Sequence, residues 1–490
     1  MREFVLILPE VILAVTLAFV VVAELTYHGE QLRFVTVSTL LGLVAAFVQT
    51  FTTYRHVPVA VFSGAVSIDG VSLFFKLLSI ALAGLSIVAA SHSEEIPPGR
   101  RTEFSALVLA ATLAMCLAAS ASDMLLIFLS LQLLNIVVFF IAGYGKRSLF
   151  SIEAGVKYLI FSGVAGVLLL YGLAVLFSIT HSLNIYEAHR AFMVASVPRT
   201  QVLIIFMLIF LSLGSQVAGF PMYLWAPDVL EGAPTPASGF IVVATRMTGF
   251  AIAIRFLIGV FAQSSLTNGN WEIVGDFNWP TIVAVVSGIT MLVGSFLALR
   301  QNRAKRMVGC LAITQSGFLL LGILVLDQVG VAALLYNLVI ELFAFVGIFY
   351  ILSYFYEQLH SDNLNDLRGM LNQSVPECIC LVLFLLCLVG MPPAPGFIGK
   401  FTLIGAIVRH QWWGLATLAI LSSALSTVAI ARLAFHLIGD ATLLKKFQSE
   451  SRSFERKAFL VVLLVPMLLA GLFANSVLNW AGKSLSYILW

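Results

Sequence analysis

About fourteen apolar stretches, each close to the ~20 residues that cross a bilayer, restrict the fold of this 490-residue chain. Hydrophobic residues make up 60% of the sequence and charged residues 10%, whereas soluble domains carry roughly a quarter charged residues. In lipid, helices of this length satisfy all of their own backbone hydrogen bonds. The sequence therefore predicts an all-α polytopic membrane protein. The expected spans are centred near Leu13, Leu43, Ser79, Leu113, Gln132, Gly166, Leu211, Gly249, Ile289, Phe318, Glu341, Leu386, Ile420 and Leu468.

Lysine and arginine residues are distributed unevenly between the two ends of these spans. With fourteen spans, 15 of them fall on one side of the membrane and six on the other. The positive-inside rule assigns the richer side to the cytoplasm, so both chain termini are predicted on the non-cytoplasmic side. The sequence has no basic stripe with interleaved aromatic residues, which argues against a nucleic-acid partner.

Proline interrupts two of the apolar stretches. The first break lies within Ser215–Trp225 and the second within Gly390–Phe401. Proline frees backbone groups that lipid cannot satisfy, so such breaks persist where they line a polar cavity or a neighbouring helix. Corresponding breaks in two halves of a chain point to an ion or substrate path. The residues that we expect to break the helices are Pro221, Pro392, Pro393 and Pro395.

The two breaks fall in the seventh and twelfth expected spans, and this odd offset of five predicts an inverted repeat. Spans 4–8 and 9–13 would then form two antiporter-like five-helix units of opposite orientation. The predicted organisation is 1–103 for the first three helices, 104–262 for the first repeat, 280–439 for the second repeat, and 440–490 for a cytoplasmic linker and the last helix. The polar connectors are too short to hold a soluble domain.

Four charged residues lie at or near membrane depth and are candidate members of a path: Lys157, Arg246, Glu341 and Lys400. A charge in this position costs a few kcal/mol or more and usually faces the bundle interior. Lys157 could instead extend to the interface, and Glu341 could make a structural hydrogen bond to a nearby helix. A contact between Lys400 and Glu341 is a hypothesis that rests on their neighbouring spans.

Other polar residues receive structural interpretations. The default role of Gln132, Gln216 and Gln315 is hydrogen bonding between helices. Local tethering is expected for Lys76 with Asp69, and anchoring is expected for Arg255 and Arg432. The proline-rich segment 225–236 is expected to be a rigid loop at a cavity mouth or subunit contact. Cys378 and Cys380 are separated by one residue, which is not a zinc-site spacing, so no metal is expected.

Two strings resemble a known family. Residues 225–236 read Trp-Ala-Pro-Asp-Val-Leu-Glu-Gly-Ala-Pro-Thr-Pro, and residues 390–401 read Gly-Met-Pro-Pro-Ala-Pro-Gly-Phe-Ile-Gly-Lys-Phe. Both strings resemble subunit N of bacterial complex I, called subunit 2 in mitochondria. Glu153-Ala154 and Lys157-Tyr158 also fall where that family has similar residues. The resemblance runs from about Ser67 to Lys400, and the string at 225–236 is specific to subunit N.

The resemblance implies an antiporter-like membrane-arm subunit of a proton-translocating NADH:quinone oxidoreductase in the bacterial inner membrane. It implies no redox chemistry on this chain, because NADH, FMN, iron-sulfur clusters and quinone would be bound by other subunits. The implied partners are an antiporter-like neighbour, the small subunits near the quinone site, and the lipid bilayer. Proton movement would be coupled to electron transfer through lysines, a carboxylate and water.

The chain departs from the family where titratable residues are usual. Lys157 and Lys400 match the family pattern. The departures are Gln132 for a glutamate, Gln216 for a lysine, Gln315 for a histidine, Arg246 for a lysine and Tyr223 for a histidine. Glutamine cannot change its charge, so the usual carboxylate–lysine step is missing in titratable form. Three hypotheses remain: a subunit with a rearranged proton path, a non-pumping structural subunit of the same complex, and an Mrp-type cation/proton antiporter subunit.

Overall fold

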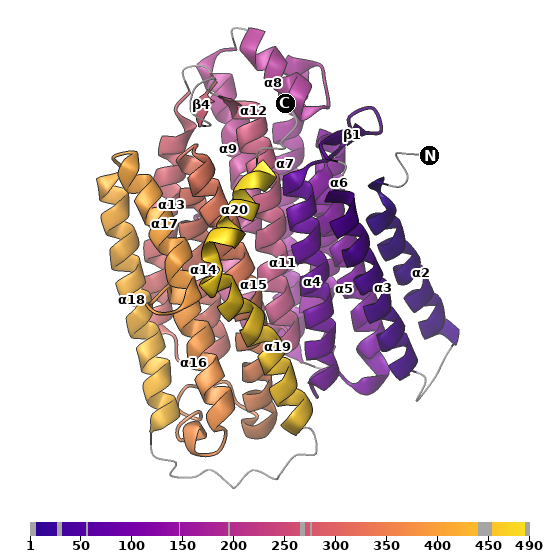
Figure 1. Ribbon diagram of the computed structural model, residues 1–490, viewed down its shortest axis with the longest axis vertical. Helices are drawn as coiled ribbons and strands as arrows, with labels where there is room; N and C mark the ends of the chain where they lie inside the picture. Colours follow the sequence, from indigo (N-terminus) through magenta and orange to yellow (C-terminus); the bar gives the residue numbers. More distant parts are fainter. Residues whose placement is uncertain are drawn as a thin grey trace.

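The computed structural model describes residues 6–26, 32–54, 57–146, 148–194, 197–264, 270–274, 277–439 and 453–485. Long helices lie side by side along the longest axis of the molecule, and short strands and loops cap their ends (Figure 1). Helix α2 begins and helix α20 ends at the upper end in this view. The predicted linker lies outside the described residues from 440 to 452.

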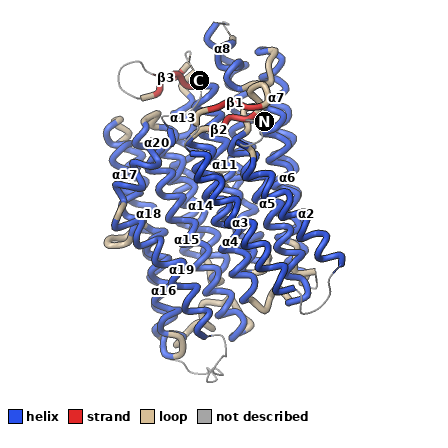
Figure 2. The backbone as a smooth tube through the Cα atoms, turned by 45° about the vertical axis from the view of Figure 1, so that its right-hand side comes forward, coloured by secondary structure: helices blue, strands red, loops and turns tan. Residues whose placement is uncertain are grey.

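The elements up to residue 261 include the first eight expected spans. The strands β1 (Val59–Val61) and β2 (Val66–Ile68) form an antiparallel hairpin at the upper end (Figure 2). The helices are α2 (Leu8–Thr26), α3 (Leu32–Thr53), α4 (Gly70–His92), η2 (Pro98–Arg100), α5 (Arg101–Ser120), α6 (Met124–Ala142), α7 (Leu149–Thr180), α8 (Ile185–Val194), α9 (Arg199–Gln216), η3 (Met222–Leu224), α10 (Trp225–Gly232), α11 (Thr235–Ala253), the π-helical turn η4 (Ile254–Ile258) and α12 (Gly259–Phe261).

The second part of the chain opens with another antiparallel hairpin, formed by β3 (Ala262–Ser264) and β4 (Trp271–Ile273). Its helices are α13 (Trp279–Arg300), α14 (Ala304–Leu324), α15 (Gln328–Leu359), η5 (Met370–Asn372), α16 (Val375–Val389), α17 (Pro395–Arg409), α18 (Trp413–Ile438), α19 (Ser453–Leu472) and α20 (Ala474–Leu485). The last two helices meet at 84°.

The all-α membrane fold is confirmed. Among the described residues, 12 helices are long and apolar enough to cross a membrane, or 13 if the bent pair α19–α20 counts as one span. Each of the fourteen expected centres lies in a helix. The expected span near Leu386 is divided between α16 and α17, each of 15 residues, so neither half is long enough to count alone.

Three helices form the centre of the bundle. In α11 and α14 the whole apolar window is buried, and in α15 94% of it is buried. By contrast, 28% of the corresponding window is buried in α2 and in α3, which lie at one edge of the molecule (Figure 1). Charged side chains on α11, α14 and α15 therefore need partners inside the protein.

The expected loop at 225–236 is wrong. Residues Trp225–Gly232 form helix α10, and α11 begins at Thr235. Pro227 lies in the first turn of α10, and Pro236 lies in the first turn of α11. Backbone N–H groups in the first turn have no partner within the helix, so proline is tolerated there. Pro227 and Pro236 therefore lie at the starts of two helices and do not exclude helical structure.

Candidate functional site

The first break follows α9, and neighbouring groups satisfy the backbone that it frees. Helix α9 ends at Gln216. The N–H of Phe220 donates to Thr290 Oγ1 on α13 at 3.0 Å. The indole Nε1 of Trp225 donates to the carbonyl of Ser215 at 2.9 Å. The break at Pro221 is thus held by side chains, as expected for an interrupted helix inside a protein.

The second break exposes two carbonyl groups to buried side chains. Helix α16 ends at Val389, and Gly390 adopts a left-handed φ of +73°. Lys400 Nζ donates to the carbonyl of Val389 at 2.9 Å, and Gln315 Nε2 donates to the carbonyl of Leu388 at 2.5 Å. The structure thereby brings Gln315 and Lys400 to the same break, beside Pro392, Pro393 and Pro395.

Arg246 and Glu341 form an ion pair in the centre of the bundle. Arg246 Nη2 lies 3.1 Å from Glu341 Oε2, and both side chains are at most 6% exposed. Arg246 also donates from Nε to Val242 O at 3.0 Å and from Nη1 to Ala312 O at 3.2 Å. Its guanidinium lies 4.4 Å from the centre of the Phe345 ring. These contacts hold a permanent positive charge beside the carboxylate, because arginine keeps its proton.

The hypothetical contact between Lys400 and Glu341 is not an ion pair in this structure. Glu341 faces Arg246. The ammonium group of Lys400 bonds to Val389 O and lies 4.0 Å from the centre of the Phe318 ring. A freed carbonyl and an aromatic face both attract a cation, so these two contacts hold the ammonium group of Lys400 without an ion pair to Glu341.

A cluster of neutral polar groups lies on α6, α7 and α9. We call this group the Asn135 cluster, and its members are Gln132, Asn135, Tyr158 and Gln216. Asn135 Oδ1 accepts from Gln216 Nε2 at 2.8 Å and from the Tyr158 hydroxyl at 3.0 Å. Asn135 Nδ2 donates to Gln132 Oε1 at 3.0 Å. Gln216 therefore makes the hydrogen bond between helices that the sequence predicted, through an asparagine that it did not single out. The bond between Gln132 and Asn135 lies within α6, so for Gln132 the structure shows a contact inside its own helix instead.

Lys157 lies in a charged cluster at the end of the bundle where α7 begins. Lys157 Nζ is 2.8 Å from Glu153 Oε1 and 2.7 Å from Asp228 Oδ2. Arg306 pairs with Asp228 and with Glu231, each at 2.9 Å. These residues line a cavity of about 860 Å³. Glu153 is one helical turn from Lys157, and the Lys157 side chain is 38% exposed.

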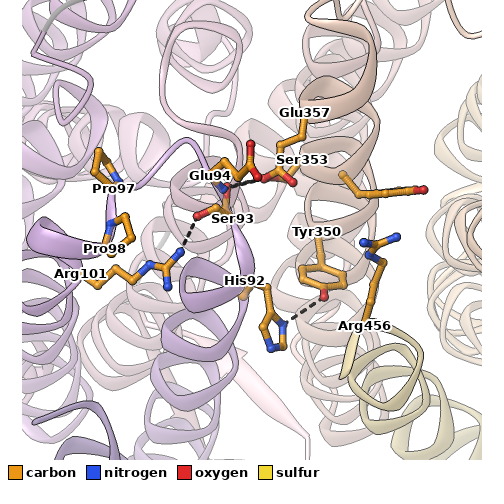
Figure 3. A pocket seen from close by; sticks show the side chains of 12 residues that line it. His92, Ser93, Glu94, Pro97, Pro98, Arg101, Tyr350, Ser353, Glu357 and Arg456 are labelled. Atoms are coloured by element: carbon orange, nitrogen blue, oxygen red, sulfur yellow. Dashed lines mark hydrogen bonds between the residues drawn. The ribbon is translucent and has the colours of Figure 1, made fainter. Parts of the chain in front are cut away.

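A second polar cavity, of about 500 Å³, opens at the same end between α4, α15 and α19 (Figure 3). His92 Nδ1 lies 3.1 Å from the Tyr350 hydroxyl, and Arg101 donates to the carbonyl of Ser93 at 3.0 Å. Glu357 accepts from the N–H of Glu94 at 2.8 Å. Polar groups therefore reach this end of α15, the helix that carries Glu341 in its middle.

The expected tether between Lys76 and Asp69 is wrong. Lys76 pairs with Glu10 on α2 at 2.5 Å, and Asp69 pairs with Arg255 on η4 at 2.9 Å. Asp69 caps the N-terminus of α4 by accepting from Ser72, which keeps its side chain away from Lys76. Arg432 donates to the carbonyl of Leu299 at 2.6 Å, which fits the expected anchoring role.

Sequence reasoning missed several members of these clusters. Asn135 is three residues after Gln132, and this helical spacing on one face is the signal that could have found it. Asp228 and Glu231 are part of the string at 225–236. Their partners Arg303 and Arg306 lie at the start of α14, and only the packing of the helices brings these residues together. No group of three or more His, Cys, Asp or Glu residues that could hold a metal ion occurs in the part of the chain that the structure describes.

Residues 121–426 match the NADH:quinone oxidoreductase/Mrp antiporter transmembrane family. A NADH-quinone oxidoreductase subunit N of Chlorobium chlorochromatii is 31% identical over 426 residues, which cover 86% of this chain and 82% of that protein. A subunit N of an Anaeromyxobacter species is 29% identical over 494 residues, which cover 97% of this chain and 95% of that protein.

Solved structures show the same architecture. A chain of respiratory complex I from Thermus thermophilus superposes with a TM-score of 0.78 at 26% identity, covering 97% of this chain and 99% of that chain. A chain of the Mrp complex from a Dietzia species superposes with a TM-score of 0.83 at 17% identity, covering 98% and 96%, and this likeness shows the fold alone. Together, the family match and the relatives show that this chain belongs to the NADH-quinone oxidoreductase subunit N family.

Proposed function

We propose that this chain is an antiporter-like membrane-arm subunit of a proton-translocating NADH:quinone oxidoreductase, in which the proton path of the first repeat is no longer titratable. Distant quinone reduction would be coupled to proton movement by the complex, and this subunit would contribute an altered or incomplete step. The chain itself would carry out no redox chemistry. NADH, FMN, iron-sulfur clusters and quinone would be held by other subunits.

The Asn135 cluster carries this proposal. It links α7 to the first break, because Tyr158 follows Lys157 directly on α7 and Gln216 is the last residue of α9. Its polar side chains are three amides and a phenol, which stay neutral near physiological pH. A proton that enters beside Lys157 therefore meets no group that can take it up by becoming charged. Amide groups can orient water, but they cannot hold the proton between steps.

The second repeat keeps titratable groups. Glu341 on α15 and Lys400 on α17, the helix that follows the second break, are each buried, at 5% and 4% exposure. Glu341 can exchange a proton in this position, whereas its partner Arg246 stays charged and sets the local field. Lys400 contacts the backbone carbonyl of Val389, which the break leaves without a partner in its helix. We propose that proton exchange in this chain is confined to Glu341 and Lys400.

The surroundings of the chain are inferred from its relatives. The curated relatives are named NADH-quinone oxidoreductase subunit N, and the Thermus thermophilus chain comes from respiratory complex I. We propose that this chain likewise assembles with an antiporter-like neighbour and with the small subunits near the quinone site, in the bacterial inner membrane. The charge distribution of the sequence supports an orientation with both termini on the non-cytoplasmic side.

A non-pumping structural role in the same complex is the second candidate. It is favoured by the observation that Arg246 and Glu341, two charged residues buried in the centre of the bundle, are paired with each other. The Mrp-type antiporter has less support, because the Mrp chain shares the fold at 17% identity whereas the subunit N relatives reach 31%.

The test restores the missing pair in the intact complex. Gln132→Glu and Gln216→Lys, introduced together, place a carboxylate and an ammonium group on the two sides of Asn135. The proton-to-electron ratio is then measured in sealed membrane vesicles during quinone reduction. We expect the ratio to rise above that of the wild-type complex, because the two new groups can change charge.

The matched control is Gln132→Asn with Gln216→Asn, which keeps neutral amides at both positions and should leave the ratio unchanged. An unchanged ratio in the restored variant, with normal assembly and quinone reduction, would contradict the claim that the missing titratable pair limits this path.

A further inference from the structure

A buried carboxylate–lysine pair lies outside both five-helix repeats, on helices α2 and α4. Lys76 Nζ is 2.5 Å from Glu10 Oε1, and the two side chains are 1% and 5% exposed. The second oxygen of the carboxylate, Oε2, is buried and has no hydrogen-bond partner among the described residues. A buried carboxylate with an unused oxygen is costly unless something else meets it.

Glu10 also lines a cavity of about 330 Å³ at the end of the bundle where α2 begins. The cavity wall includes Ser120 and Asp123, and the exposed side chain of Phe62 lies on its rim. The wall is otherwise mostly apolar, with Leu117, Leu126 and Leu129. The carboxylate is therefore buried from bulk solvent but borders a cavity at the end of the bundle where α2 begins.

The neighbouring pair on the same helix provides a contrast. Asp69 caps α4, and Arg255 Nη2 donates to Asp69 Oδ1 and to Ala119 O, both at 2.9 Å. Arg255 Nη1 donates to the Tyr186 hydroxyl at 3.1 Å. Asp69 Oδ2 is, like Glu10 Oε2, buried without a hydrogen-bond partner among the described residues. The Asp69–Arg255 pair is nevertheless fixed, because it contains an arginine and is held by several hydrogen bonds. The Glu10–Lys76 pair contains two groups that can each change their protonation state.

We propose that Glu10 and Lys76 form a proton-exchanging pair that is reached from the end of the molecule at which α2 begins. In the exchange step, the Glu10 carboxylate takes up one proton at Oε2 and becomes a neutral carboxylic acid, while Lys76 remains an ammonium ion. Release of the same proton restores the ion pair. The titratable groups that face the pair are Cys116 on α5 and Asp123 at the start of α6.

This site goes beyond the proposed function, because it does not involve either repeat or the breaks in them. Its position suggests a route of influence on the first repeat. Helix α4 carries both Lys76 and Asp69, and α4 packs along α11, which leads into the turn that bears Arg255. A change in the charge of Glu10, the partner of Lys76, thus acts on α4, whose first turn is tied through Asp69 to Arg255 at the end of α11.

Labelling with dicyclohexylcarbodiimide in membranes that contain the intact complex tests the proposal. This lipophilic reagent adds to a protonated carboxyl group, and the O-acylisourea first formed rearranges to a stable N-acylurea that mass spectrometry locates. We expect label on Glu10 that increases as the pH falls, because the reagent requires the protonated carboxyl group. Asp69 should remain unlabelled over the same pH series, because it is capped and bound to Arg255.

Two variants sharpen the test. Lys76→Met removes the positive charge that favours the ionised carboxylate, so labelling of Glu10 should extend to higher pH than in the wild-type complex. Ala65→Phe fills part of the cavity and should slow the labelling of Glu10 several-fold without changing its dependence on pH. Ala65 is on the cavity wall and is not a member of the ion pair.

A purely structural tether gives a different result. Glu10 would then stay unlabelled across the pH series in the wild-type complex, or its labelling would not depend on pH, and either outcome overturns the proposal. Should Lys76→Met fail to assemble, the wild-type pH series and Ala65→Phe still decide. A second readout is the proton-to-electron ratio of Glu10→Gln, which we expect to fall, whereas an unchanged ratio would show that any exchange here is not coupled to turnover.

Discussion

The two lysines that match the family pattern lie in opposite environments. Lys157 is at the end of the bundle, 38% exposed, between the carboxylates of Glu153 and Asp228. Lys400 is 4% exposed and contacts a backbone carbonyl and an aromatic ring, with no carboxylate in an ion pair. A solvent-screened lysine with two partners keeps its charge at little cost, whereas a buried lysine holds its charge only through weaker contacts. The comparison indicates that the surroundings restrict the protonation of Lys400 more strongly than that of Lys157.

The largest effect is expected from Glu341→Gln, which breaks the buried Arg246–Glu341 pair at the centre of the bundle. Arg246 would keep its charge with no counter-ion, and breaking such a pair costs about 3–5 kcal/mol. We expect much less assembled complex on native gels and a lower thermal stability. The control Arg246→Gln with Glu341→Gln removes both charges and should recover most of the assembly. Equal losses in the single and double variants would contradict a paired role for these residues.

Lys400→Ala tests the comparison of the two lysines through proton pumping. The substitution leaves the Val389 carbonyl without its partner, which costs about 1–3 kcal/mol. With the path of the first repeat already neutral, we expect the proton-to-electron ratio to fall by less than about twofold at unchanged assembly. Lys400→Arg should keep the charge and the contact as a control. Near-complete loss of pumping with intact assembly would show that this chain still carries a complete path.

Gly390→Ala tests the geometry that lets Lys400 reach the break. Gly390 has a φ of +73°, and a Cβ there would lie 2.7 Å from Lys400 Cδ. An L-residue in the left-handed region costs roughly 1–2 kcal/mol, to which displacement of the lysine stem adds. We expect a lower melting temperature of the purified complex. Gly405→Ala, where a Cβ meets no atom within 4 Å, is the matched control and should be neutral.

The smallest effect is expected from Lys157→Ala. Each exposed pair that Lys157 makes is worth about 0.2–1 kcal/mol, and Arg306 remains to pair with Asp228. We therefore expect slight loss of stability and a proton-to-electron ratio near that of the wild-type complex. Lys157→Arg controls for charge. A large fall in the ratio would reverse the comparison and place the sensitive step in the charged cluster around Lys157.

Much of the fold could be predicted from local sequence features. Apolar length gave the helices, and the prolines near residues 221 and 392 gave the two breaks, because both act through backbone rules. The same rules failed at 225–236, where Pro227 and Pro236 begin helices. The distinction depends on where a proline falls within a turn, which the count of prolines does not reveal.

The pairing of charges was less predictable. Lys157 and Glu153 are one helical turn apart, so their contact follows from spacing. Arg246 and Glu341 are on separate helices, and several carboxylates could have faced the arginine until the helices were packed. Lys76 illustrates the same limit, since Asp69 is near it in sequence whereas Glu10 on another helix is its partner.

A high-resolution structure of the intact complex during turnover tests the central claim most directly, through the ordered waters between Lys157 and Lys400. The account predicts ordered water around Glu341 and Lys400, and a gap without water at the Asn135 cluster. A continuous chain of water from Lys157 past Asn135 and Gln216 to Lys400 would contradict it, because protons could then cross the first repeat without a titratable pair.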